Sequence, residues 1–413
     1  MTLDDYLSSS RLLRRLTAGP LNDGIGLYVD RLRRDGYGWI HARSALHILT
    51  HFARWLSDRR FDIQDIDEHR VRQFLKAYTR RRSLRGGDRS ALDRLISTMR
   101  DAGIIGPAVP VMLTPHEQIL EGFRQYLEQR RGVSATSAES YVWFMRRILR
   151  GLPVAGIEDL RCLTQRDVVG YVEQHADDGS AATTKILCSR FRSFLRYIFL
   201  EGLADTDLSA CIPSIRRYSL TGLPTYLSAP QLEQVLRGCD RTTAVGKRDY
   251  AALMMLARLG LRAKEVATLT LDDVDWRTGQ FLIRGKGRRR AFMPLPPDVG
   301  EALAAYLSNG RPASGSRHIF LRACPPHVGF PSAQGIRDIA RRAIERAGID
   351  HPGRRGSHIF RHSLATELLR SGATLTQIGQ VLRHQHHDTT RIYAKVDLAS
   401  LRTLILPWPG AGQ

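Results

Sequence analysis

The side chains best suited to chemistry are gathered between Ser357 and Tyr393. His358 and Arg361 lie three residues apart, so a helix with its N-cap at Ser357 places them on one face. An arginine can bind two oxygens of a phosphate at once, and a histidine can exchange a proton near neutral pH. His384 and Tyr393 add a second imidazole and a phenol. Each residue alone also fits an ordinary basic helix or a buried tyrosine, so the interpretation depends on the set.

Two further cations stand where a side chain can be held rigidly. Arg262 follows the run Leu259–Leu261, where a helix is expected to end at a glycine. Glu265, three residues later, either orients a basic neighbour or forms a weak surface ion pair. Lys286 lies between two glycines in a predicted hairpin turn, where it either reaches into a groove or is solvated.

Together these side chains suit the reversible transfer of a phosphodiester to a tyrosine. Tyr393 can attack phosphorus, because a phenolate is both a competent nucleophile and a leaving group. Arg262 and Arg361 can hold the two non-bridging oxygens of the phosphate. His358 can act as a base or position the phosphate, and Lys286 can protonate the leaving 5′-oxygen.

The same arrangement needs no metal or other cofactor. His384 can donate a hydrogen bond to the pentavalent phosphorane, and the guanidinium groups can supply the positive charge that magnesium supplies elsewhere. The sequence contains no carboxylate pair at two-metal spacing and no phosphate-binding Gly-x-x-x-x-Gly-Lys loop. The cluster of His384, His386 and His387 and the pair His47 and His51 lack thiols and a complete ligand set. Five scattered cysteines without a Cys-x-x-Cys pair indicate neither a disulfide framework nor a zinc site.

The hydrophobic pattern predicts a multidomain chain. Two small all-α domains, residues 1–112 and 113–221, precede a mixed α+β catalytic domain with a small antiparallel sheet, residues 222–413. The first two domains repeat a similar helical pattern at an offset of roughly 95–99 residues. Proline-containing linkers are expected at 103–115 and 213–224. In the last domain we expect strands at 274–276, 281–284 and 290–294 and helices near 298–307, 334–347, 357–371 and 375–382.

The net charge of +21 favours a polyanion such as nucleic acid as the partner. The predicted domains carry +7, +1 and +13 in chain order, so most of the excess lies in the last one. No apolar run approaches the roughly 20 residues that span a bilayer, and the N-terminus lacks a signal-peptide pattern. We therefore expect no membrane partner and a reducing cytoplasm as the location.

In these residues and spacings the chain resembles the tyrosine recombinase, or phage integrase, family. The gap of 23 residues from Arg361 to His384 matches that family, as does the tyrosine nine residues beyond this histidine. The resemblance covers about residues 222–405 through these motifs and 114–212 more weakly, as a helical core-DNA-binding domain. The active-site types that the family uses occur here in order as Arg262, Lys286, His358, Arg361, His384 and Tyr393.

Two parts of the chain depart from the usual pattern of the family. Residues 1–112 lie outside its two-domain plan and form an extra helical domain, a candidate for DNA binding. Arg383 replaces a glycine that commonly precedes the histidine, so it is expected either to add a phosphate contact or to alter the turn that places His384.

The resemblance implies a site-specific DNA recombinase that integrates, excises or transposes a DNA element. Tyr393 would form a 3′-phosphotyrosyl link, and four protomers would act on two duplexes through a Holliday junction. The implied partners are double-stranded recombination sites, further copies of the chain in a homotetramer on DNA, and, as an open possibility, partner recombinases. An amphipathic tail at 396–405 would pack on a neighbouring protomer or on its own domain. A bacterial, nucleoid-associated protein in the cytoplasm is expected.

Two other functions use a similar scaffold. A type IB topoisomerase relaxes DNA with a comparable set of arginines, lysine, histidine and tyrosine. A non-catalytic DNA-binding regulator would be expected to lack some of the six residues. The complete set and the helical N-terminal half favour the recombinase.

Overall fold

The computed structural model describes residues 5, 7, 10–108, 113–176, 181–215, 225–285, 290–349, 356–384 and 389–396. Contacts between Cα atoms divide the chain into two compact units. One is Val109–Thr221, and the other combines Met1–Ala108 with Gly222–Gln413. The predicted division into three domains remains a prediction.

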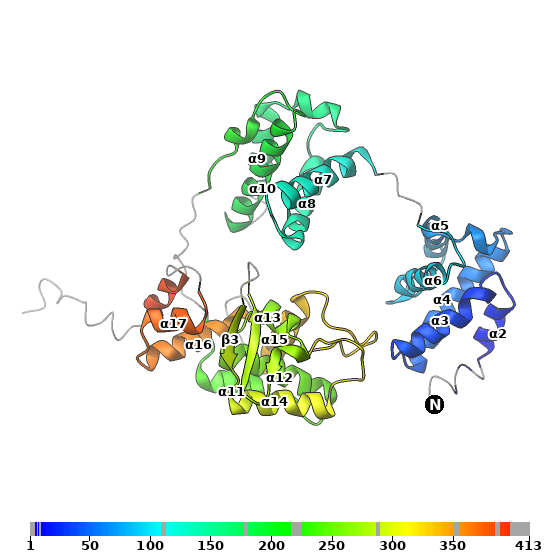
Figure 1. Ribbon diagram of the computed structural model, residues 1–413. Coiled ribbons are helices and arrows are strands. Elements are labelled where there is room, and N and C mark those ends of the chain that lie inside the picture. The colour runs from blue at the N-terminus through cyan, green and yellow to red at the C-terminus, as the bar shows by residue number, and fades with distance from the viewer. Residues whose placement is uncertain are drawn as a thin grey trace, which may run out of the picture. The chain divides into compact units, whose positions relative to one another are not determined.

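Residues 10–108 form a helical bundle around a continuous apolar core (Figure 1). Large buried side chains such as Tyr28, Leu46 and Phe52 fill this core because they recur at helical spacing on the inner faces. Asp67 shows how the helix starts are fixed: its carboxylate accepts a hydrogen bond from the backbone N–H of Arg70 at 2.8 Å. The elements are α2 (Arg11–Thr17), α3 (Asn22–Arg34), α4 (Trp39–Ser57), η1 (Ile63–Asp65), α5 (Glu68–Thr79) and α6 (Asp88–Asp101).

The unit Val109–Thr221 is also helical and has its own core. Phe123, Phe191 and Phe194 are fully buried in it. Its elements are α7 (Pro115–Gln125), the π-helical turn η2 (Tyr126–Arg130), α8 (Ala135–Leu149), η3 (Glu158–Cys162), α9 (Gln165–Ala176), α10 (Ala181–Leu200) and η4 (Leu208–Cys211).

The two helical regions repeat one order of elements. In each, two α-helices are followed by a 3₁₀ turn and two further α-helices: α3, α4, η1, α5 and α6, then α7, α8, η3, α9 and α10, with the π-helical turn η2 extending α7. The starts of corresponding elements lie 93 to 97 residues apart. This order agrees with the repeat that the sequence pattern suggested.

The last part of the chain packs helices around α12, whose residues 251–257 are all buried. A helix that is apolar all round belongs at the centre of a fold, and α12 contacts α14 and α16 most extensively. The helices are α11 (Ala229–Arg237), α12 (Ala244–Leu259), α13 (Ala263–Thr268), α14 (Pro297–Asn309), α15 (Gln334–Arg346), α16 (His358–Arg370) and α17 (Leu375–Val381), followed by the 3₁₀ turn η8 (Arg391–Val396).

A three-stranded antiparallel sheet in the order β1-β2-β3 lies in this part of the fold. Its strands are β1 (Val274–Asp275), preceded by η5 (Leu271–Asp273), then β2 (Gln280–Arg284) and β3 (Arg290–Pro294). Phe281 is buried and pairs with Met293, whereas Arg284 pairs with Arg290 at the end of the hairpin.

The predicted helical character and the small antiparallel sheet are confirmed. The bounds of the predicted strands and of the four predicted helices after them lie within one or two residues of those of β1–β3, α14, α15, α16 and α17. Within the described ranges, none of the helices combines the length and the apolar character needed to cross a membrane.

Candidate active site

The turn after α12 organises the basic side chains of the site. Gly260 ends the helix in the left-handed region at φ 58°, a conformation that glycine adopts without steric cost. A Cβ atom at this position would lie 2.7 Å from Cδ2 of Leu382. The carbonyl of Gly260 accepts a hydrogen bond from Nη1 of Arg361 at 2.5 Å. The glycine therefore lets the end of α12 lie close to Leu382 and to Arg361.

Arg262 is the N-cap of α13 and is bound by a buried carboxylate. Its backbone N–H donates to Oε2 of Glu265 at 2.9 Å, and its Nη1 donates to Oε1 at the same distance. The Glu265 side chain is 4% exposed, whereas that of Arg262 is 37% exposed. Glu265 therefore orients Arg262 rather than forming a surface ion pair with it, because the carboxylate of Glu265 is buried in the core.

Arg383 is the second guanidinium bound by Glu265. Its Nη2 donates to Oε2 at 2.9 Å, and its Nη1 contacts the sulfur of Met293. Its backbone has φ 54°, which is unfavourable for a side chain with a Cβ. Burial lowers the pKa of Arg383, while Glu265 raises it. Arg383 thus binds Glu265, and its expected phosphate contact remains a prediction.

Arg361 is buried on α16 and joins the ends of two helices. Nη1 binds the carbonyl of Gly260 at the end of α12, and Nη2 binds the carbonyl of Leu382 at the end of α17. Such carbonyls carry the negative end of a helix dipole, so a cation is stabilised there. Burial, followed by the charges of Arg262 and Arg383, lowers the pKa of Arg361 to about 10, which leaves it charged at neutral pH.

His358 is the first residue of α16 and is accessible to solvent. Partial desolvation, followed by the charges of Arg361 and Arg262, lowers its pKa, so the imidazole is neutral at pH 7. A neutral imidazole can accept a proton or orient an oxygen. Ser357 does precede the helix, but its side chain makes no capping hydrogen bond because its backbone is already helical at φ −56° and ψ −21°. The predicted position of Ser357 as the N-cap is therefore confirmed, but its side chain does not cap the helix.

Tyr393 lies in η8 and its side chain is 2% exposed. Its hydroxyl is 2.8 Å from Nδ1 of His362, and its ring is parallel to that of His384 at 6.4 Å between centroids. Burial raises the pKa of Tyr393 to about 12, and the charge of Arg361 opposes this rise. The phenol is therefore protonated and covered in this arrangement.

Two histidines complete the surroundings of the tyrosine. Burial is the first cause that lowers the pKa of His362 and of His384 to about 4, and neighbouring histidine and arginine side chains add to it. Nδ1 of His384 is 2.7 Å from Oγ1 of Thr390, and its backbone N–H donates to Gly379 at 2.9 Å. Both imidazoles are thus neutral at pH 7, and His384 is held by side-chain and backbone contacts.

Five of the six predicted site residues are described, and they come together from separate elements. Arg262 begins α13, His358 and Arg361 lie on α16, and His384 and Tyr393 follow α17. Lys286 lies outside the described residues, in the connection between β2 and β3, as does the tail from residue 397 onward. The sequence analysis missed His362 and the role of Arg383. For His362 a signal existed, because it stands four residues after His358 and therefore one helical turn along the same side.

Comparisons with known families place the two matched regions within one class. Residues 225–399 match the phage integrase family, and residues 120–202 match the N-terminal SAM-like domain of phage integrases. These regions define a tyrosine recombinase, a class of enzymes that break and rejoin DNA. The chain belongs to the phage integrase family of tyrosine recombinases.

Similar proteins include relatives that match nearly the full chain. A Sinorhizobium fredii (strain NGR234) protein, y4rA, described as an integrase/recombinase, is 38% identical and the match covers 99% of both chains. The tyrosine recombinase XerD of Mycobacterium tuberculosis is 32% identical over 71% of this chain and 96% of its own length.

Solved structures show the same fold. A lambda integrase dimer bound to a COC′ core site has a TM-score of 0.53 at 18% identity and covers 68% of this chain and 95% of its own. The XerH recombinase bound to palindromic difH substrate, a post-cleavage complex, has a TM-score of 0.53 at 19% identity and covers 69% of this chain and 83% of its own.

Proposed function

We propose that Tyr393 is the nucleophile of this recombinase and that Arg262 and Arg361 bind the scissile phosphate. The phenolic oxygen would attack phosphorus and expel the 5′-oxygen of the next nucleotide, which leaves a 3′-phosphotyrosyl link. The energy of the broken ester is kept in this link, so the reverse attack by a 5′-hydroxyl rejoins the strand. The observation that supports this most directly is that one buried cluster holds Tyr393 beside two neutral imidazoles and near the charge of Arg361.

Proton transfer and stabilisation of the phosphorane are assigned to three further side chains. His358 is neutral and accessible, so it can accept the proton of the phenol or position the phosphate. Lys286, in the connection between β2 and β3, is the proposed acid for the leaving oxygen. His384 can stabilise the phosphorane by a hydrogen bond. The guanidinium groups supply the positive charge at phosphorus, so no metal enters the proposal.

The arrangement of Tyr393 corresponds to a resting state. Its hydroxyl is engaged with His362 and its side chain is covered, whereas an attacking oxygen needs a free path to phosphorus. Cleavage therefore requires η8 to shift so that the hydroxyl leaves His362. The binding of DNA or of a neighbouring protomer would provide the free energy for this shift.

The proposed partners are double-stranded recombination sites and further copies of the chain. Solved relatives of the same fold include a lambda integrase tetramer bound to a Holliday junction. We infer a homotetramer on DNA, open to partner recombinases, with residues 113–221 as the core-DNA-binding domain and 222–413 as the catalytic domain. The reaction would serve integration, excision or transposition of a DNA element, in the cytoplasm of a bacterium at its nucleoid.

A suicide substrate tests the nucleophile. A nicked recombination site loses its cleaved end by diffusion, so the wild-type chain should accumulate a covalent adduct that resists detergent. Tyr393→Phe should form none, whereas Tyr306→Phe should form it, because Tyr306 is equally buried but binds the backbone N–H of Leu321. An adduct with Tyr393→Phe would refute the assignment.

Two further outcomes separate the alternatives. A wild-type chain that forms no adduct on any candidate element end would favour a non-catalytic regulator. Relaxation of unrelated supercoiled plasmid, without a paired recombination site, would favour a topoisomerase.

A further inference from the structure

Helix α4 presents an uncompensated basic stripe in a region that neither family model covers. Its 19 residues contain no aspartate or glutamate. Arg43, His47, His51 and Arg54 follow one another at intervals of four, four and three residues, so they share one side of the helix. The opposite side is apolar and buried, as Leu46 and Leu49 show. The stripe therefore faces outward, with both arginines exposed.

The loop between α5 and α6 extends this stripe. Nη1 of Arg82 lies 2.9 Å from Nε2 of His51, and the rings of His47 and His51 are 4.8 Å apart. Arg85, three residues further along the loop, acts electrostatically on both histidines. We name this surface the basic face and define it as Arg43, His47, His51, Arg54, Arg82 and Arg85.

The positive charge of the basic face is not balanced locally. Burial and then the nearby basic groups lower the pKa of His51, and burial followed by Arg85 does so for His47. Asp88 opposes this effect at His47, but it is buried and its carboxylate accepts from the backbone N–H of Arg85 at 2.8 Å. Among the residues that the structure places, none forms an ion pair with the four arginines of the basic face.

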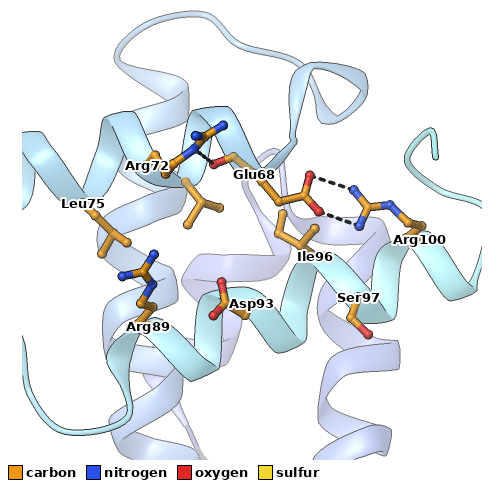
Figure 2. Close-up of a pocket in the computed structure, with 9 residues that line it drawn as sticks. Glu68, Arg72, Leu75, Arg89, Asp93, Ile96, Ser97 and Arg100 are labelled. Atoms are coloured by element: carbon orange, nitrogen blue, oxygen red, sulfur yellow. Dashed lines mark hydrogen bonds and ion pairs between the residues drawn. The ribbon is translucent and has the colours of Figure 1, made fainter. Parts of the chain in front are cut away.

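On another surface of the same bundle, a carboxylate binds an arginine. The hollow between α5 and α6 is also lined by arginines, but Glu68 binds Arg100 there through two contacts of 2.7 and 3.0 Å (Figure 2). Asp93 lines the same hollow (Figure 2). Elsewhere in the bundle Arg31 binds Asp101 at 3.2 Å. Arg100 and Arg31 of this bundle are thus bound by carboxylates, whereas no carboxylate among the described residues binds the four arginines of the basic face.

We propose that the basic face binds backbone phosphates of duplex DNA beyond the segment held by the two domains that the family models match. Exposed guanidinium groups without carboxylate partners bind phosphate and release counterions from DNA. The proposal rests on DNA as the substrate of this class. It is supported by the order of elements, which repeats that of the matched SAM-like domain. The contacts would add affinity without reading sequence.

Binding of the full chain to a fluorescein-labelled duplex of random sequence tests the proposal, with Tyr393→Phe as background to prevent covalent trapping. The triple variant Arg43→Gln, Arg82→Gln, Arg85→Gln should bind about tenfold or more weakly at low salt. The slope of log affinity against log salt should become shallower by about 2 to 3, close to one for each lost phosphate contact. The matching Arg→Lys triple variant should retain most of the affinity, because lysine also binds phosphate as a point charge.

A control variant removes the same charge from another helix of the bundle. Arg11, Arg14 and Arg15 are exposed on α2, and their replacement by glutamine should leave the affinity within about twofold of the unmodified chain. An equal loss in both glutamine variants would show a general effect of net charge and overturn the proposal, as would an unchanged affinity in the first. With Tyr393 restored and DNA at saturation, the basic-face variant should still form the covalent adduct. Formation of this adduct tests the proposed nucleophile independently of the DNA affinity that the basic face is proposed to add.

Discussion

Replacement of Glu265 by glutamine tests whether the negative charge of this residue stabilises the two arginines that it binds. The carboxylate is 4% exposed and accepts from the backbone N–H and Nη1 of Arg262 and from Nη2 of Arg383. Glutamine keeps one acceptor oxygen but removes the negative charge and points an N–H donor at a guanidinium. Loss of one partner of a buried ion pair costs about 3–5 kcal/mol. Because Arg262 remains partly solvated, we expect the lower end, about 3 kcal/mol.

The same change should slow cleavage. Without Glu265 the guanidinium of Arg262 is no longer held in place, and a displacement of about 1 Å in a phosphate ligand can cost about 100-fold in rate. We expect a reduction of about this size in adduct formation on the suicide substrate at saturating DNA.

The expected loss of stability in Glu265→Gln is measured by amide hydrogen exchange of peptides from α12 and α16. This readout is preferable to a single melting curve, because a chain with several hydrophobic cores is not expected to unfold in one step. The control is Glu233→Gln, whose partner Arg258 lies 3.0 Å away with both side chains 42% exposed. This exposed pair should contribute under about 1 kcal/mol and leave cleavage unchanged. If Glu265→Gln loses no more protection from hydrogen exchange than Glu233→Gln, the charge of Glu265 does not stabilise this region.

Three other changes test neighbouring parts of the site. Arg383→Gly should change the stability of the α12–α16 region by no more than about 1 kcal/mol, because relief of the positive φ offsets the lost contact with Glu265. A loss of protection from hydrogen exchange as large as that of Glu265→Gln would contradict this. Lys286→Ala should slow adduct formation, and a substrate with a bridging 5′-sulfur, whose thiolate leaves without a proton, should restore the rate; without rescue, Lys286 is not the acid. His362 and His384 have pKa values of about 4 against 6.5 in the unfolded chain, so the folded state binds fewer protons and stability should fall as the pH drops from about 6.5 to 4. His384→Gln should make this pH dependence shallower, and an unchanged slope of stability against pH would count against the assignment.

Local signals in the sequence were sufficient for much of the catalytic region. Apolar periodicity predicted its helices, and turn residues between β-rich runs predicted the three strands. The three-residue spacing of Arg262 and Glu265 allowed an orienting contact or a surface ion pair, and the structure shows that Glu265 binds Arg262 from within the core. These features depend on residues close together in the chain.

The features that the sequence analysis missed depend on tertiary packing. The contact between Tyr393 and His362 joins residues 31 positions apart, and the contact between Arg383 and Glu265 joins residues 118 positions apart. No periodic pattern encodes such pairs. Ser357 is the N-cap of α16, as its sequence position indicated, but its side chain makes no capping hydrogen bond because its backbone is already helical. The role of Lys286 remains a prediction.

The engagement of Tyr393 with His362 has a consequence for a cell that contains many copies of the chain. A recombinase that binds DNA through charge will spend much of its time at sequences that are not its target. As the proposed nucleophile, a covered and protonated Tyr393 would not cut there, so encounters with random DNA would leave no strand breaks to repair. On the proposed function, the hydrogen bond that would delay the first step at the correct site would also limit genome damage at all the others.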